Sequence, residues 1–180
     1  YLGVEPLLVG AGLKTGHDLR VDNAREVGAD RIVNDVAAIR KYGAPVIVID
    51  FGTATTFNVI NEQREFIGGI IAPGIRGSMD SLVSGTAKLP RVEIETPKSA
   101  IGKNTITNMQ AGLVFGFAGL VDYIVKKIRR EMKRPDMPVV ATGGFSEIIA
   151  KEISCINVVD KLLTLQGLKY LYDLNAEGKK

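Results

Sequence analysis

The chain has 180 residues, a length that can form one substantial hydrophobic core or two small ones. Hydrophobic residues make up 46% and charged residues 24%, which excludes a disordered chain and indicates a soluble globular protein. Basic and acidic side chains nearly balance, at 23 and 20, and the basic ones are scattered, so we expect neither a nucleic acid nor a membrane as partner.

The apolar residues change along the chain between the period of a helix and that of a strand. Recurrence every three or four residues over 30–42 is typical of an amphipathic helix, whereas the β-branched run at 45–50 is typical of a buried central strand. In chain order we predict a short buried strand at 6–12, a helix at 30–42, the central strand at 45–50, an antiparallel meander through 51–71, a helix at 74–83, an extended segment at 88–95, a long helix at 105–132, a strand at 137–141, a helix from 145, a short strand at 156–159 and a helix at 162–174.

This order of elements predicts an α/β fold with a mixed sheet. Up to about residue 43 the chain offers one strand and one helix, which cannot close a core alone. We therefore expect residues 1–43 to be the remnant of a first domain, carrying a substrate-side motif, and 44–180 to form a second domain. The chain begins with Tyr1 and not with methionine, which indicates a fragment.

The segment D-F-G-T-A-T-T at Asp50–Thr56 is the most informative motif. Gly52 would let the backbone approach a phosphate closely, and the hydroxyls of Thr53 and Thr56 can donate to its oxygens. Asp50, at the end of a strand, is placed to hold a cation or a water beside those phosphates. A tight hairpin with threonines in strand positions would give the same pattern, so both interpretations stay open.

T-G-G at Thr142–Gly144 is a second turn of this kind, between a predicted strand and a helix. Its backbone N–H groups would suit a nucleotide, although a plain loop can have the same composition. Two strand–glycine–threonine turns in one α/β chain support each other. Actin-like and sugar-kinase-like folds use such turns to hold ATP between two related domains.

G-A-D-R at Gly28–Arg31 opens the first predicted helix. Asp30 is well placed there as a helix cap. Alternatively, Asp30 is a general base and Arg31 a bidentate ligand for a carboxylate. His17 is predicted to be an ordinary loop histidine, and the single cysteine, Cys155, excludes an internal disulfide and agrees with a reducing compartment.

Taken together, the motifs resemble the type III pantothenate kinases. The matching segments are G-A-D-R at 28–31, D-F-G-T-A-T-T at 50–56, G-G-I-I-A-P-G at 68–74, I-G-K-N-T at 101–105 and T-G-G at 142–144, in the order and spacing of that family. The resemblance implies an actin-like, acetate-and-sugar-kinase (ribonuclease H-like) fold. It also implies ATP-dependent phosphorylation of pantothenate, the first step of coenzyme A biosynthesis, with Mg²⁺ or another divalent cation, K⁺ or NH₄⁺, and a cytoplasmic homodimer.

The resemblance further implies a role for each matching residue. Asp30 would be the general base for the pantothenate hydroxyl, and Asp50 would hold the monovalent cation. Pantothenate would contact Gly28, Arg31 and, near the dimer interface, Thr105. The phosphates and nucleotide of ATP would contact Gly52, Thr53, Thr56, Gly143 and Gly144.

Two departures from the family pattern stand out. Ala24 follows Asn23 where the family usually has proline, which we expect to be tolerated. The D-x-G-N-T loop with which the family binds phosphates and divalent metal has no counterpart, so we expect the isolated 180 residues to lack kinase activity. One alternative is a non-enzymatic regulatory relative, since the family includes relatives described as accessory transcription factors, and another is a different phosphotransferase or a phosphatase of the same fold. The retained Asp30, Arg31 and Asp50 favour the kinase.

Overall fold

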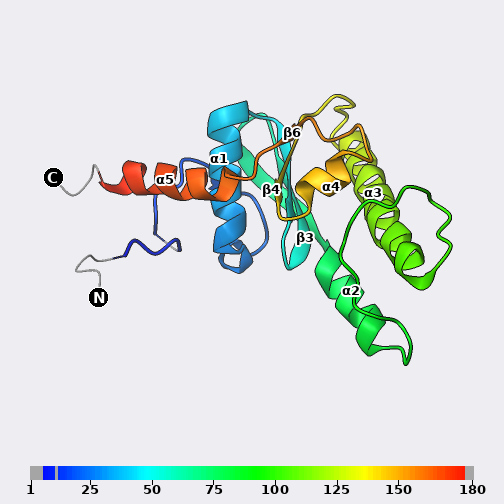
Figure 1. Cartoon of the computed structure of the whole chain (residues 1–180). Helices are drawn as coiled ribbons and strands as arrows, with labels where there is room; N and C mark the ends of the chain where they lie inside the picture. The colour runs from blue at the N-terminus through cyan, green and yellow to red at the C-terminus, as the bar shows by residue number, and fades with distance from the viewer. Residues whose placement is uncertain (1–5, 11, 177–180) are drawn as a thin grey trace.

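The computed structural model describes residues 6–10 and 12–176. They form a six-stranded mixed sheet with helices on both of its faces (Figure 1). The elements are β1 (Asp18–Leu19), the 3-10 helix η1 (Ala24–Glu26), α1 (Ala29–Tyr42), β2 (Val46–Phe51), β3 (Ala54–Ile60), β4 (Glu65–Pro73), α2 (Ile75–Ser84), α3 (Thr105–Glu131), β5 (Val139–Gly143), α4 (Ser146–Ala150), β6 (Val158–Val159) and α5 (Leu163–Ala176).

The strand order in the sheet is β1-β4-β3-β2-β5-β6. Strands β2, β3 and β4 form an antiparallel meander, and β5 and β6 extend it in parallel on the other side of β2. Strand β2 lies inside the sheet because its run Val46–Ile49 is apolar and fully buried, as the β-branched sequence predicts. The mixed α/β sheet expected from the sequence is therefore confirmed.

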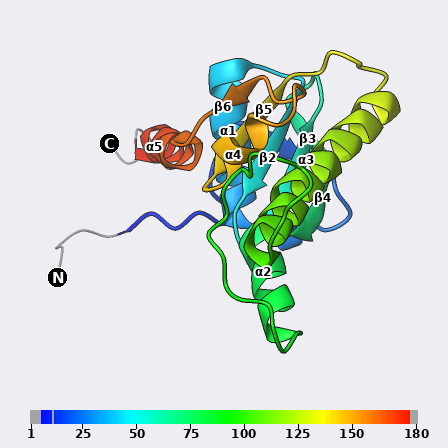
Figure 2. The same cartoon turned by 45° about the vertical axis from the view of Figure 1, so that its right-hand side comes forward.

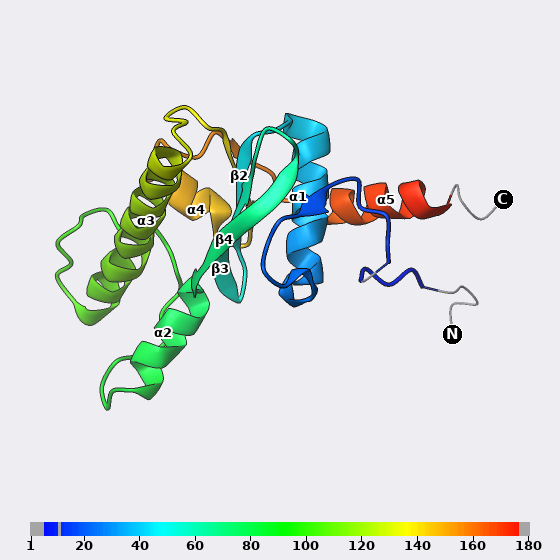
Figure 3. The same ribbon diagram turned by 180° about the vertical axis from the view of Figure 1, so that it is seen from behind.

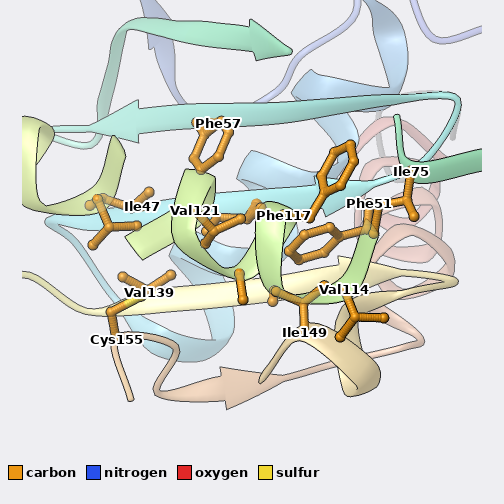
Figure 4. Packing of buried hydrophobic residues seen from close by; sticks show 14 of the residues in the cluster. Ile47, Phe51, Phe57, Ile75, Val114, Phe117, Val121, Val139, Ile149 and Cys155 are labelled. Atoms are coloured by element: carbon orange, nitrogen blue, oxygen red, sulfur yellow. The ribbon is translucent and has the colours of Figure 1, made fainter. Parts of the chain in front are cut away.

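The two faces of the sheet are covered by different helices. Alternate residues of a strand point to opposite faces, so Val46 and Val48 pack with α1 and α5, whereas Ile47 and Ile49 pack with α3 and α4. We call these the α1 face and the α3 face. Figure 4 shows the α3 face, where side chains of α3 pack against those of β2, β3 and β5. Asp50 continues the every-second-residue series of Val46 and Val48, and so its side chain belongs to the α1 face.

The arrangement of the helices follows from these contacts. α3 lies diagonally across its face of the sheet in Figure 2, and seen from behind in Figure 3 it remains on the side opposite α1 and α5. α5 packs on α1 at Gly167, where a Cβ would collide with the backbone of Val33.

Within the described ranges, no helix is both long enough and apolar enough to cross a membrane.

The short buried strand predicted at 6–12 is wrong. Residues 6–10 form no strand, Leu8 is 80% exposed, and Ala11 lies outside the described residues. Val9 and Leu13 pack instead onto an apolar cluster between α1 and α5. A helix surface offers side-chain contacts but no free backbone groups for a ladder, so this apolar run is anchored through its side chains.

The first part of the chain is joined to the sheet at two places. β1 pairs in parallel with β4, and α1 packs on β2 and β3. The segment 88–95 pairs with no described strand, and only Val92 in it is buried. The other predicted helices and strands are confirmed, with ends displaced by a few residues. The division into domains 1–43 and 44–180 stays a prediction.

Candidate active site

A row of polar side chains crosses three neighbouring strands on the α1 face. Asp50 of β2 is paired in register with Thr56 of β3 on one side and with Thr142 of β5 on the other. Because paired residues share a face of the sheet, all three side chains belong to the α1 face. The register thus brings together the predicted residues Asp50 and Thr56 and adds Thr142, which is buried.

Asp50 is a half-buried carboxylate with one firm hydrogen bond. Its Oδ2 accepts from Asn34 Nδ2 at 3.0 Å, and Asn34 Oδ1 accepts in turn from Thr164 Oγ1 at 2.7 Å. Burial raises the pKa of Asp50, the bond from Asn34 opposes that rise, and the charge of Asp30 adds to it. Asn34 lies one helical turn after Asp30 in α1, so its bond to Asp50 places the start of α1 beside this carboxylate.

Both predicted glycine turns converge on the carboxylate of Asp50. Gly143 has φ +90°, and a Cβ on it would lie 2.6 Å from Asp50 Oδ1. A Cβ on Gly52 would lie 3.6 Å from the same oxygen. The exposed Thr53 and Gly144 follow directly in the two turns, so the structure places the predicted phosphate-side residues at one end of the sheet.

The start of α1 presents Asp30 on the surface. Gly28 is the N-cap, without a side-chain capping bond, and Asp30 stands in the first turn. The interpretation of Asp30 as the helix cap is therefore wrong. A Cβ on Gly28 would lie 2.5 Å from Asp30 Oδ1, so glycine leaves room for this carboxylate. The exposed carboxylate is favoured by the helix dipole.

Arg31 is held from three sides. Its Nε donates to Asn58 Oδ1 at 2.7 Å, and its Nη2 donates to the carbonyl oxygen of Phe57 at 3.2 Å. The guanidinium carbon lies 5.1 Å from the centroid of the Phe66 ring, and a Cβ on Gly69 would collide with Nη2. Burial lowers the pKa of Arg31, which nearby Asp35 and Asp30 partly offset. Nη1 makes no bond within the described part of the chain, so its two N–H groups can serve a ligand.

Comparison with known proteins assigns the chain to a family. The model of the type III pantothenate kinase family matches residues 1–127. The chain belongs to the type III pantothenate kinase family. It is 53% identical over 179 residues to the type III pantothenate kinase of Geobacillus kaustophilus and 52% identical over 179 residues to that of Geobacillus thermodenitrificans, and each alignment covers 99% of this chain and 69% of the relative.

A solved structure shows the same fold at lower identity. The protein from Campylobacter jejuni, named for the Baf family of transcriptional activators, matches with a TM-score of 0.61 and 22% identity, over 86% of this chain and 67% of that one. This likeness concerns the fold alone. With the mixed sheet, it confirms the actin-like, acetate-and-sugar-kinase (ribonuclease H-like) fold class expected for a type III pantothenate kinase.

Thr105 lies apart from the other predicted residues of the type III pantothenate kinase site. It stands exposed in the first turn of α3, behind a capping box formed by Asn104 and Thr107. α3 covers the face opposite α1 (Figures 1 and 3). One copy of the chain therefore does not bring Thr105 to Asp30, and its role in binding stays a prediction.

The site also contains residues that the motifs did not single out. Asn34 and Asp35 follow Asp30 and Arg31 by one helical turn each, and this spacing alone places them on the same face of α1. Asn58 follows Thr56 by two residues, which places it on the same face of β3. His17, predicted to be an ordinary loop residue, has its side chain only 1% exposed and 3.9 Å from Asp35.

The described residues contain no cluster of metal-ligating side chains, that is, no group of three or more His, Cys, Asp or Glu that could hold a metal ion. Mg²⁺ usually keeps several waters and takes few carboxylates together with substrate phosphates. Asp50, half-buried beside the glycine turns, is the carboxylate available to a cation at this end of the sheet.

Proposed function

We propose that this protein phosphorylates pantothenate with ATP, the first step of coenzyme A biosynthesis. The observation that carries the proposal is that the start of α1, which bears Asp30, and two glycine turns meet around Asp50 at one end of the sheet. Membership of the type III pantothenate kinase family supports the substrate. The likeness to a Baf family protein concerns the fold and does not favour the regulatory alternative.

Asp30 and Arg31 would act on pantothenate. Pantothenate has a carboxylate at one end and a primary hydroxyl at the other, so it needs a cationic group and a base. Arg31, anchored through Nε and Nη2, would offer Nη1 to the carboxylate, and Gly28 would line the path of the substrate. Asp30, exposed at the helix start, would accept the hydroxyl proton as oxygen attacks phosphorus.

The two glycine turns would hold the triphosphate. Gly52 and Gly144 are exposed and have no side chain to block a phosphate, and the hydroxyls of Thr53 and Thr56 can donate to phosphate oxygens. Gly143 keeps the second turn close to Asp50. ATP supplies the phosphoryl group, and Mg²⁺ and K⁺ or NH₄⁺ balance the phosphate charge when bound. Asp50 would retain the monovalent cation, which would relieve the cost of burying its own charge.

We also propose a homodimer in the cytoplasm, with no nucleic-acid or membrane partner. Thr105 would then complete the site from a second copy. What supports a second copy is the groove of about 880 Å³ between α2 and α3, lined by Leu82, Met109 and Leu113 among others. Ile106, beside Thr105, is 50% exposed. Burial of such apolar surface is the usual driving force for association.

The proposal is tested by ADP release from the full-length protein. Pantothenate, ATP, Mg²⁺ and K⁺ are supplied together and then omitted one at a time, and mass spectrometry identifies the phosphorylated product. We expect ADP release to require pantothenate and Mg²⁺ and to be stimulated by K⁺. Asp136→Asn, at an exposed position, is the matched control for later carboxylate variants. ADP release that does not depend on pantothenate would contradict the proposal.

A further inference from the structure

A closed polar network lies beneath Arg31. Asn58 Nδ2 donates to Asp35 Oδ1 at 2.6 Å, and Asn58 Oδ1 accepts from Arg31 Nε at 2.7 Å. The same Nδ2 also approaches the carbonyl oxygen of Arg31 at 3.3 Å. Asn58 is 2% and Asp35 0% exposed. The amide therefore bridges a buried carboxylate and the guanidinium that faces the proposed substrate.

The carboxyl group of Asp35 fixes which way this amide faces. Oδ1 of Asp35 is an acceptor, so it selects the NH₂ end of Asn58 and directs the amide oxygen to Arg31. If the amide turned over, its NH₂ group would face the N–H of Arg31, and its bonds with Asp35, with Arg31 Nε and with the carbonyl oxygen of Arg31 would be lost. Hydrogen bonds to charged groups contribute roughly 1.5–3 kcal/mol each, so the observed orientation is strongly preferred.

The charges around Asp35 agree with this arrangement. Arg31 lies one helical turn before it, and the Nε2 atom of His17 lies 3.9 Å from Oδ2. Burial lowers the pKa of His17 and so favours its neutral form, and Arg31 is the charged group that offsets the charge of Asp35. Oδ2 is the oxygen without a hydrogen-bond partner in the described part of the chain. It can carry a proton while Oδ1 still accepts from Asn58, so the amide is oriented in both protonation states.

We propose that Asp35 is a positioning residue for Arg31, acting through Asn58, and thereby sets the affinity of the site for a carboxylate substrate. This inference rests on the proposed function, in which Arg31 binds the carboxylate of pantothenate. With Nε and one N–H of Nη2 anchored, Nη1 and the second N–H of Nη2 are left for the ligand. A guanidinium without the bridge would sample several rotamers, and the substrate would have to order it.

The first test needs no substrate. In full-length ¹⁵N-labelled protein, the Nε–Hε signal of Arg31 is assigned by its loss in Arg31→Lys. Asp35→Asn keeps an oxygen acceptor for Asn58, whereas Asp35→Ala removes it. We expect Asp35→Asn to retain a signal that exchanges slowly with water, and Asp35→Ala to accelerate that exchange at least about tenfold. Equal exchange in Asp35→Ala and wild type would overturn the proposal.

The second test separates positioning from general stability. Asp35→Ala should raise the KM for pantothenate about tenfold, the equivalent of about 1.4 kcal/mol, with kcat and the KM for ATP changed less than about twofold, and Asp35→Asn should stay near wild type. Asn58→Ser removes the amide that bridges Asp35 and Arg31, so it should show the same selective rise in the KM for pantothenate. This variant replaces Asp35→Ala in the test if Asp35→Ala does not fold. A parallel change of both KM values and kcat would overturn the proposal. If the wild type does not phosphorylate pantothenate, the proposed function fails, and the exchange measurement still decides whether Asp35 holds Arg31.

Discussion

Replacing Asp35 by asparagine should change how the stability of the protein depends on pH. Asp35 is fully buried, and burial raises its pKa from 3.8 to about 7, although hydrogen bonding by Asn58 and the charge of Arg31 oppose the rise. The folded protein therefore binds this proton more tightly than the unfolded chain. The stabilising contribution of the protonated carboxyl is fully present below about pH 3.8 and is lost as pH rises through about 7.

The size of the effect follows from the two pKa values. One pKa unit corresponds to about 1.4 kcal/mol, so ionising Asp35 lowers the free energy of unfolding by roughly 4 kcal/mol at alkaline pH. About 3 kcal/mol of this loss falls between pH 5 and pH 8. Asp35→Asn cannot ionise, so the difference in free energy of unfolding, variant minus wild type, should increase by about 3 kcal/mol from pH 5 to pH 8.

Urea unfolding followed by circular dichroism at the two pH values measures this difference. Burial lowers the pKa of His17, so its contribution to the free energy of unfolding is lost as pH falls below 6.5, whereas that of Asp35 is lost as pH rises. It is present in both proteins and therefore largely cancels. Asp136→Asn, at an exposed position, controls for the substitution itself. A variant-minus-wild-type difference that is equal at pH 5 and pH 8 would refute the raised pKa of Asp35.

Two further predictions concern the surroundings of Asp50. Gly143→Ala places a Cβ 2.6 Å from Asp50 Oδ1 at φ +90°, so it should lower the free energy of unfolding by about 1–3 kcal/mol and raise the KM for ATP. Urea unfolding and steady-state kinetics measure these two effects. Wild-type values for both would show that the turn has room for a side chain. Asp50→Ala should abolish the stimulation of turnover, or of thermal stability, by K⁺ or NH₄⁺, because the half-buried carboxylate is the proposed ligand. An unchanged response to K⁺ in that variant would place the ion elsewhere.

Much of the fold could be predicted because its signals are local. The run at 45–50 is apolar and β-branched, and it became the strand at the centre of the antiparallel and parallel pairings. The run at 6–12 is also apolar, but its described residues have no described strand beside them, and an apolar composition does not say whether a pairing partner exists. Whether an apolar run becomes a strand therefore depends on tertiary structure, which supplies or withholds a neighbouring strand.

In the candidate site too, local features could be predicted and tertiary contacts could not. Gly52 and Gly143 could be predicted because glycine turns after strand ends are local features, and their convergence on Asp50 follows from parallel pairing of β2 with β5. The contacts of Asn58 and His17 with Asp35 could not be predicted, because they depend on how β3 and the segment before β1 pack against α1. Thr105 was predicted from the family resemblance, and its place on the α3 face follows from packing that no motif records.

The central claim is that Asp30 takes the proton of the pantothenate hydroxyl during transfer of the phosphoryl group of ATP. ³¹P NMR of full-length wild-type protein and of Asp30→Asn, with pantothenate, ATP, Mg²⁺ and K⁺, measures this transfer directly. We expect the wild type to form one phosphate ester for each ADP released, and Asp30→Asn, folded as judged by circular dichroism, to be slower by roughly 10²–10⁴. A folded Asp30→Asn protein that forms the ester at the wild-type rate would contradict the account.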